Sequence, residues 1–410
     1  EGIDRSFTST AGIAAGRPVI LNSAGTVTQV AESTTSSYVL GTKQTVLSLS
    51  ADMYLSSQNS SLAYDSTSGA VMSVYRASST QYPTVIAGQY TSSGQITWGT
   101  PTVVKSTGGS MYPSIVSGGG KFHITYSYDG SNNVYARWAT ASGTTITLGN
   151  ETALNSNSTW GYPVAIWCSD ISRLLVVFGN YNQTQAYANI LEVTATAYTV
   201  SSVIGINTNS NTYALVAQSL TFDSSTNRVL MTYRSSTQFL AKVLTVSTSS
   251  ISAGTQQLVT DEKAGEVATT YDSNINRIIF RYNAGSGSSP STTGVNFRVI
   301  GITGGSTNTI SVTSATFSGN SDAFNNKGSG FVFNSDDNIT YATLVSQTAP
   351  LTQFPLTSTV SGVTVGTGIV IGSATNSLSC RASSTFNSTK NAVVTVFTEP
   401  SATSYNLFSS

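Results

Sequence analysis

An internal repeat constrains the fold of this chain more than any other feature. A short apolar segment that closes on an aromatic residue recurs at intervals of roughly fifty residues. The seven copies are Gly69–Tyr75, Lys121–Tyr126, Arg173–Phe178, Asn227–Tyr233, Asn276–Tyr282, Gly330–Phe333 and Asn391–Phe397. Four antiparallel strands in each unit of this length are typical of a β-propeller blade. We therefore predict an all-β, seven-bladed β-propeller of four-stranded antiparallel blades.

The composition of these segments indicates that sheets stack on one another. Their residues are apolar at successive positions instead of alternating with polar ones, as in Arg173–Phe178. A short strand of this kind is buried on both faces. Propeller blades, which pack face to face around a ring, meet that requirement. For the first unit we predict strands over residues 61–65, 70–76, 83–90 and 95–104.

The turn before each apolar segment is repeated as well. An aromatic residue is followed by Asp-Ser or Asn-Ser, and a Gly or Asn stands before the next strand. This pattern occurs at Tyr64–Gly69, Phe222–Asn227, Tyr271–Asn276 and Phe386–Asn391, and the third and sixth units lack it. Asp and Asn side chains bond turn backbones, and Gly and Asn tolerate positive φ. These segments are predicted to be hairpin turns. A calcium loop is disfavoured because each turn carries at most one carboxylate, whereas calcium takes 6–8 oxygen ligands.

A small residue recurs in the predicted outer strand and suggests a kink there. It is glycine at Gly41, Gly99, Gly149, Gly254 and Gly366, with a weaker match at Gly205. The segment that carries Gly41 lies near the N-terminus, while the last unit has only a third strand, 404–409, before the chain ends. We therefore predict that residues 38–47 pair with 404–409 and close the ring, which removes two exposed strand edges.

Two further regions are assigned from the same pattern. Residues 1–37 lie outside the predicted propeller (38–410) and contain a hairpin, with strands near 18–23 and 26–30 around a Ser-Ala-Gly turn. A lone hairpin is marginal in water, so we expect this arm to pack on a partner, on a second copy or on the ring. Segments 283–294 and 346–362 are interpreted as lengthened loops in the fifth and sixth blades.

Charge and cysteine content exclude several classes of protein. Only 9% of residues are charged and the net charge is +0, which argues against a nucleic-acid binder. No apolar run approaches the length of about 20 residues needed to cross a bilayer, so membrane insertion is not expected. The cysteines, Cys168 and Cys380, fall in blades on opposite sides of the predicted channel. Both are therefore expected to be free and mostly buried.

The sequence shows no constellation for catalysis. The one histidine, His123, lies inside a predicted buried strand, so histidine-based nucleophile activation and acid–base chemistry lack their usual residue. Carboxylate pairs suited to glycoside hydrolysis are not visible, and the repeated turn of sialidases is missing. We predict no catalytic residue, no metal site and no cofactor. An enzyme with a carboxylate-only site remains an alternative.

The most plausible contact surface is one end of the ring. The aromatic residues Tyr54, Tyr112, Tyr162 and Tyr213 precede successive inner strands, with Trp160 beside one of them; Arg76 and Arg234 end second strands at the same end. Two readings stay open for the tyrosines. As wedges between blades they would be buried apart from their hydroxyl groups; as a binding platform they would expose a ring face.

The repeat style resembles that of propeller repeats in virion proteins of tailed phages, particularly of marine and cyanobacterial phages. The likeness rests on the Tyr-Asp-Ser turn, on strands ending Tyr-Arg, on the segment Trp98–Val104 and on the leader Ala14–Val27. It implies a non-enzymatic virion component, most plausibly a tail-fibre or appendage protein that contacts the host surface. The alternatives are a capsid decoration or head-fibre protein and a secreted carbohydrate-binding propeller. The resemblance also implies location in the virion, contact with other virion proteins through residues 1–37, a homo-oligomer in the particle and a host glycan or protein as ligand.

Overall fold

The fold was obtained as a computed structural model. It describes residues 19–21, 27–29, 41, 43–49, 61–77, 80–92, 94–107, 110–128, 133–154, 163–179, 185–207, 219–234, 238–261, 263–285, 294–303, 308–313, 330–344, 350–372, 382–400 and 405–409. The chain divides into two units, Glu1–Leu40 and Gly41–Ser410. In the first unit, β1 (Val19–Leu21) pairs antiparallel with β2 (Val27–Gln29), which are the two strands of the expected hairpin.

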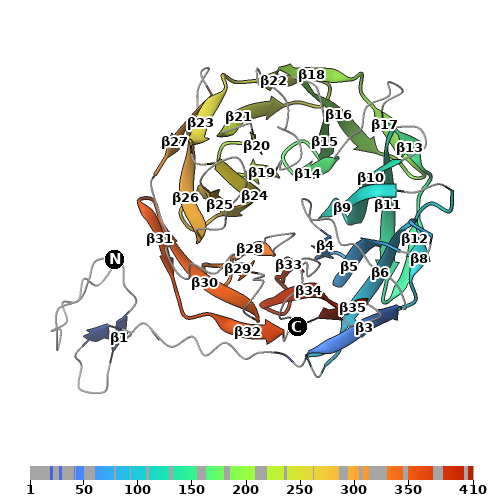
Figure 1. Ribbon diagram of the computed structural model, residues 1–410, viewed down its shortest axis with the longest axis horizontal. Helices are drawn as coiled ribbons and strands as arrows, with labels where there is room; N and C mark the ends of the chain where they lie inside the picture. Colours follow the sequence, from blue (N-terminus) through green and yellow to red (C-terminus); the bar gives the residue numbers. More distant parts are fainter. Residues whose placement is uncertain are drawn as a thin grey trace, which may run out of the picture. The chain divides into compact units, whose positions relative to one another are not determined.

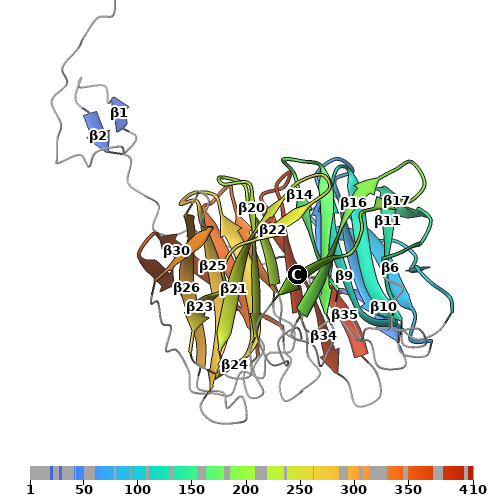
Figure 2. The same ribbon diagram turned by 90° about the horizontal axis from the view of Figure 1, so that it is seen from above.

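The second unit is built from antiparallel sheets arranged around a common centre (Figure 1). The described residues form seven sheets of four or five strands and contain no helix, so none of them lies in a helix long and apolar enough to cross a membrane. The prediction of an all-β propeller is confirmed. Figure 2 shows the sheets from the side, standing next to one another.

Each sheet has the same strand order from the centre outward. The first, innermost strands are β4 (Leu62–Asp65), β9 (Ser110–Gly118), β14 (Val164–Cys168), β19 (Ser219–Asp223), β24 (Lys263–Asp272), β28 (Phe331–Asn334) and β33 (Ala382–Asn387). The second strands are β5 (Ala70–Arg76), β10 (Lys121–Tyr128), β15 (Arg173–Gly179), β20 (Arg228–Arg234), β25 (Arg277–Gly285), β29 (Ile339–Leu344) and β34 (Ala392–Pro400). The third strands are β6 (Pro83–Tyr90), β11 (Val134–Ser142), β16 (Gln185–Val193), β21 (Phe239–Val246), β26 (Gly294–Thr303), β30 (Leu351–Thr359) and β35 (Tyr405–Ser409).

The outer strand is broken into two pieces in five of these sheets. Both pieces pair with the third strand, and they are β7 (Ile96–Trp98) with β8 (Thr102–Val103), β12 (Thr145–Leu148) with β13 (Thr152–Ala153), β17 (Tyr198–Val200) with β18 (Ile204–Asn207), β22 (Ile251–Ala253) with β23 (Gln257–Thr260), and β31 (Gly362–Val365) with β32 (Ile369–Gly372). The remaining two outer strands are β27 (Thr309–Val312) and β3 (Gln44–Leu49).

The second strands form the core because both of their faces are covered. In β5, successive side chains point to opposite sides: Val71 packs in a cluster with Val394 of one neighbouring sheet, and Met72 packs with Phe122 of the other. All four are fully buried. Continuous apolarity in the sequence therefore corresponds to burial between two sheets, as predicted.

The predicted hairpin turns between the first and second strands are confirmed. A buried Asp or Asn at the end of the first strand accepts a hydrogen bond from a backbone N–H two or three residues later. For example, Asp65 Oδ2 accepts from the Ser68 N–H at 2.9 Å and Asp223 Oδ1 accepts from the Ser225 N–H at 2.9 Å. The residue before the second strand has positive φ, as at Asn227 with φ 53°. This conformation favours Gly and Asn, which explains their recurrence.

Four of the predicted kink glycines, Gly99, Gly149, Gly254 and Gly366, lie at the breaks between the two pieces of an outer strand, whereas Gly41 precedes β3, which is described in one piece. The Gly149 N–H still donates to the Trp138 carbonyl at 2.9 Å, and the pairing of the outer strand with β11 is interrupted after this bond. A Cβ on Gly149 would lie 2.3 Å from the Trp138 ring, so the close approach of the backbone requires glycine here. The weaker match at Gly205 is wrong: the break in that sheet follows the Ser201 N–H bond to Ile190 (3.0 Å), and Gly205 lies inside β18.

The N-terminal and C-terminal parts of the second unit meet in one sheet. β3 pairs antiparallel with β35, with Gln44 opposite Ser409 and Leu49 opposite Tyr405. The pairing strand is therefore 44–49, not 38–47, and residues 38–40 lie outside the described part. Neighbouring innermost strands contact one another along the chain, and β33 of the last sheet contacts β4 of the first.

The expected assignment of the sixth unit is wrong. Phe331–Asn334, expected as part of a second strand, is the innermost strand β28, and the second strand is β29, which ends at Leu344. The sixth unit does have the hairpin turn: Asn334 Oδ1 accepts from the Asp336 N–H at 2.9 Å, and Asn338 has φ 57°. Phe333 of β28 resembles in sequence the aromatic residue that ends a second strand. The equivalent position in the sixth unit is the aliphatic Leu344 of β29.

The two proposed loop insertions have different outcomes. Segment 346–362 is not a lengthened loop, because residues 351–359 form β30, the third strand of its sheet. This strand contains four Ser or Thr residues and Pro355, a composition that in the sequence is typical of a linker. In segment 283–294, β25 extends to Gly285 and β26 begins at Gly294, while 286–293 lie outside the described residues.

Candidate functional site

The predicted contact face is only partly visible. Tyr54, Trp160, Tyr162 and Tyr213 lie outside the described residues. Arg76 and Arg234 do end the second strands β5 and β20; Arg76 is half-buried. The end of the ring that was predicted to bind therefore stays a prediction.

Tyr112 does not precede its inner strand but lies within it. It occupies β9 with a positive φ of 54°, at a point where the pairing register of β9 and β10 shifts. The register shift shows that the Tyr-Pro pair forms a bulge in the strand instead of a loop before it. The side chain is half-buried.

The described residues carry a polar hollow on the outer rim, which we call the rim hollow. It measures about 340 Å³ and is lined by Val103, Val104, Lys105, Ser106, Thr107, Arg137, Asn150 and Glu151. The residues from Val103 to Thr107 end the outer strand of the β4–β8 sheet, whereas the other three belong to the adjacent β9–β13 sheet. The hollow is therefore formed between neighbouring sheets.

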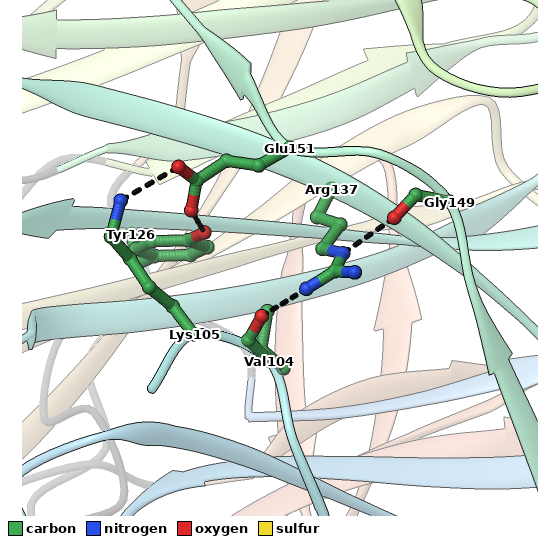
Figure 3. Close-up of polar contacts among 6 residues, drawn as sticks. All are labelled: Val104, Lys105, Tyr126, Arg137, Gly149 and Glu151. Atoms are coloured by element: carbon green, nitrogen blue, oxygen red, sulfur yellow. Dashed lines mark hydrogen bonds and ion pairs between the residues drawn. The ribbon is translucent and has the colours of Figure 1, made fainter. Parts of the chain in front are cut away.

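Glu151 is held from two sides (Figure 3). The Lys105 ammonium lies 2.6 Å from Glu151 Oε1, and the Tyr126 hydroxyl donates a short hydrogen bond to Oε2. Lys105 also sits over the Tyr135 ring, with its Nζ 4.0 Å from the centroid. Burial, reinforced by the bond to Glu151, raises the pKa of the Tyr126 hydroxyl well above its ordinary value. Tyr126 therefore remains a donor, and the carboxylate is fixed in one orientation.

Arg137 ties the two sides of the rim hollow together (Figure 3). Its Nε donates to the Gly149 carbonyl at 2.5 Å, and its Nη1 donates to the Val104 carbonyl of the adjacent sheet. A guanidinium group has five N–H donors. The donors not used in these two bonds remain available to a ligand in the hollow, because Arg137 has no other described partner.

Comparison with equivalent positions shows which of these contacts are structural. In the β19–β23 sheet, Tyr233 donates to Gln256 Oε1 at 2.6 Å, as Tyr126 does to Glu151, and Lys242 donates to the Gly254 carbonyl at 3.4 Å, as Arg137 does to Gly149. The tyrosine bond and the donor on the third strand thus secure the broken outer strand. The charge on Glu151 has no counterpart at Gln256.

Sequence reasoning missed the rim hollow because its residues come from two units. The available signal was the residue two positions after each kink glycine, which is Lys43, Pro101, Glu151, Gln256 or Gly368. Only at Glu151 is that residue acidic, and only the structure shows that Lys105 of the preceding sheet faces it.

His123 occupies a second buried polar cluster. Its ring stacks on Trp167 at 5.1 Å between centroids, its Nδ1 lies 2.8 Å from the Tyr198 hydroxyl, and its Nε2 lies 3.0 Å from the Gly118 carbonyl. Because a carbonyl only accepts, Nε2 carries the proton and Nδ1 accepts from Tyr198. Burial lowers the pKa of His123 from 6.5 to about 4. The imidazole is therefore a neutral link between sheets at neutral pH.

Cys168 is also in a structural position. Cys168 ends β14 as a free, buried thiol whose pKa burial raises to about 12; Cys380 lies outside the described residues. In the described part of the chain, no group of three or more His, Cys, Asp or Glu residues is arranged to hold a metal ion.

Comparison with known proteins supports the fold. No family model and no curated protein matches the chain. Among solved structures, a protein of Lactobacillus plantarum is similar at 12% identity, with 89% of this chain and 94% of that chain covered and a TM-score of 0.53. A putative 6-phosphogluconolactonase of Bacteroides fragilis is similar at 10% identity, with 76% and 84% covered and a TM-score of 0.54. A sialidase of Trypanosoma rangeli aligns at 9% identity, with 98% of this chain and 59% of that chain covered and a TM-score of 0.44. At such identities, the likeness to the first two structures shows the fold alone.

Proposed function

We propose that this chain is a non-enzymatic structural protein of a tailed-phage particle, a tail-fibre or appendage component that contacts the host surface. The resemblance of its repeats to those of phage propellers supports the location. The outer strands support a contact role, because β12 and β27 alternate exposed Thr or Ser residues with half-buried aliphatic residues, which gives the rim a hydroxyl-rich surface.

The main support for a non-enzymatic role is that several titratable side chains are held in hydrogen bonds that stabilise the fold. Asp65 and Asp223 are buried and bonded to turn N–H groups, His123 is buried and neutral, and Glu151 accepts from Tyr126. Groups fixed in this way stabilise the fold and are poorly placed to exchange protons with a substrate.

The architecture completes the proposal. We take the seven sheets as seven blades of one closed ring, in which β3 supplies the outer strand of the last blade, and residues 1–37 as the segment that binds other virion proteins in a homo-oligomer. Deleting residues 1–48 should give an aggregating or unfolded product, because β35 keeps β34 but loses its outer partner strand β3 and becomes an exposed edge. Deleting residues 1–36 should leave thermal unfolding unchanged. A folded, monomeric and equally stable 1–48 deletion would disprove closure by β3.

Location tests the functional proposal. Antibodies against the purified chain should label intact phage particles at the tail or its appendages in electron micrographs. Label on the capsid would replace the tail-fibre assignment by a decoration or head-fibre protein. Particles that carry no label and no peptide of this chain would refute a virion role.

A second candidate is a secreted carbohydrate-binding propeller. It is favoured by the rim hollow, which gathers amide, hydroxyl and charged groups around a space at the lower end of the range of about 300–1,000 Å³ for small-molecule sites. Recovery of the chain from culture medium free of particles would favour this candidate.

A further inference from the structure

We propose that the rim hollow binds one acidic monosaccharide unit, a sugar ring that bears a carboxylate, on the host surface. This inference rests on the proposed contact function and names the ligand class for it. The conclusion follows from the charge, donor geometry and size of the hollow.

The charges of the rim hollow favour a ligand with a single negative charge. Lys105 and Arg137 contribute two positive charges and Glu151 one negative charge, so the lining is net positive by one. A monoanion balances this charge. A doubly charged phosphate or sulfate would exceed it and would be repelled by the Glu151 carboxylate.

The donors match a carboxylate on one side and ring hydroxyls on the other. Arg137 uses Nε and Nη1 for Gly149 and Val104, which fixes the guanidinium plane and leaves its other donors for a planar carboxylate. Asn150 is exposed at the edge, and Ser106 and Thr107 are exposed on the opposite wall. Amide and hydroxyl groups both donate to and accept from sugar hydroxyls.

The size and rigidity of the rim hollow also fit one sugar unit. A volume of about 340 Å³ admits a single pyranose ring with its carboxylate, not a long oligosaccharide. The Lys105–Glu151 ion pair has side chains only 15% and 29% exposed, so this wall is formed before a ligand arrives. A single sugar unit of this size should bind with a dissociation constant on the order of 1 mM.

Isothermal titration of the full chain tests the inference. Methyl β-D-glucuronide should bind, methyl β-D-glucoside should bind at least about tenfold more weakly, and sodium sulfate should not compete. Asn150→Asp places a second carboxylate at the hollow without touching the Arg137 bonds, and should weaken glucuronide binding about tenfold or more. Arg137→Met should abolish it. Lys242→Met, which removes the equivalent donor beside Gly254 in a sheet where no such hollow is described, is the matched control and should bind normally.

The inference would be overturned by a lack of glucuronide binding, by glucoside binding of equal strength, or by unchanged affinity in Asn150→Asp. Sulfate that competes fully would show a general anion site and would also overturn it. These failures are distinct from failure of the proposed function, because particle labelling does not depend on the hollow. Labelled particles without glucuronide binding would reject only the acidic sugar.

Discussion

Acidification should destabilise this protein through one side chain, His123. The imidazole is fully buried, and burial holds its pKa at about 4 against 6.5 for the free group. The unfolded chain therefore binds a proton at higher pH than the folded chain. The contribution of His123 to stability is complete above pH 6.5, decreases as the pH falls below that value, and is lost by about pH 4.

The size of the effect follows from the pKa difference. At 1.36 kcal/mol per pH unit, the difference between 6.5 and about 4 corresponds to about 3 kcal/mol in total. Between pH 7 and pH 4.5, roughly 2 kcal/mol of unfolding free energy should be lost through this residue. The cause is structural, since a proton on Nδ1 would face the Tyr198 hydroxyl that now donates to it.

Two measurements check this prediction. Because the chain has 1 His, its imidazole signals in an NMR titration need no assignment, and they should stay in the neutral form down to about pH 5. Urea unfolding at pH 7 and 4.5 should show a larger loss of stability for the wild type than for His123→Gln, which cannot be protonated. Equal losses in both proteins, or a native imidazole that titrates near 6.5, would refute the reasoning.

Three further predictions concern packing and hydrogen bonds. Tyr126→Phe removes a hydrogen bond to a carboxylate and should lower the unfolding free energy by about 2 kcal/mol. Tyr233→Phe removes a hydrogen bond to a neutral amide and should cost about 1 kcal/mol. Equal losses for the two variants in urea unfolding would count against the charge-assisted bond. Gly149→Ala pushes a Cβ into the Trp138 ring and should lower the unfolding free energy by about 1–3 kcal/mol. Gly41→Ala has open space around the new Cβ and should change the unfolding free energy by no more than about 0.5 kcal/mol. Similar urea-unfolding midpoints for the two variants would contradict the close approach of Gly149 to Trp138. Cys168 should resist alkylation in the native protein at pH 8 and react after unfolding, and rapid labelling of its peptide would show that the thiol is accessible.

The strands could be predicted from the sequence in units that contain both the apolar second strand and the Asp-Ser or Asn-Ser turn before it. In the first unit, strands expected at 70–76 and 83–90 have those bounds in the structure. The buried second strand is recognisable because both of its faces are apolar, and the turn before it is recognisable because positive φ restricts the residue type. Both signals are local, so they can be seen without knowing the partner strand.

The sixth unit shows where this reasoning fails. Phe333 mimicked the aromatic that closes a second strand, whereas the equivalent position is Leu344, which is 1% exposed. Burial between two sheets requires an apolar side chain there, not an aromatic one. The Phe-Asn-Ser turn at residues 333–335 was the better guide, because a turn fixes the register of the strand that follows it.

The candidate site could not be predicted because it depends on contacts between units. Lys105 and Glu151 lie in neighbouring sheets and meet only when those sheets pack. Arg137 is one of several half-buried residues of β11, and its partners are main-chain carbonyls that carry no sequence signature. A hydrogen bond from a side chain to the main chain of another unit leaves no recurring residue spacing in the sequence from which it could be predicted.

Competition for adsorption tests the central claim, contact with the host surface, most directly. Host cells are incubated with saturating purified chain, washed, and exposed to the phage, and the fraction of particles adsorbed is measured against cells treated with heat-unfolded chain. The proposed function predicts that the folded chain occupies the receptors and lowers adsorption severalfold. Adsorption that stays unchanged on cells shown to be saturated, or a folded chain that does not bind the cells at all, would contradict it.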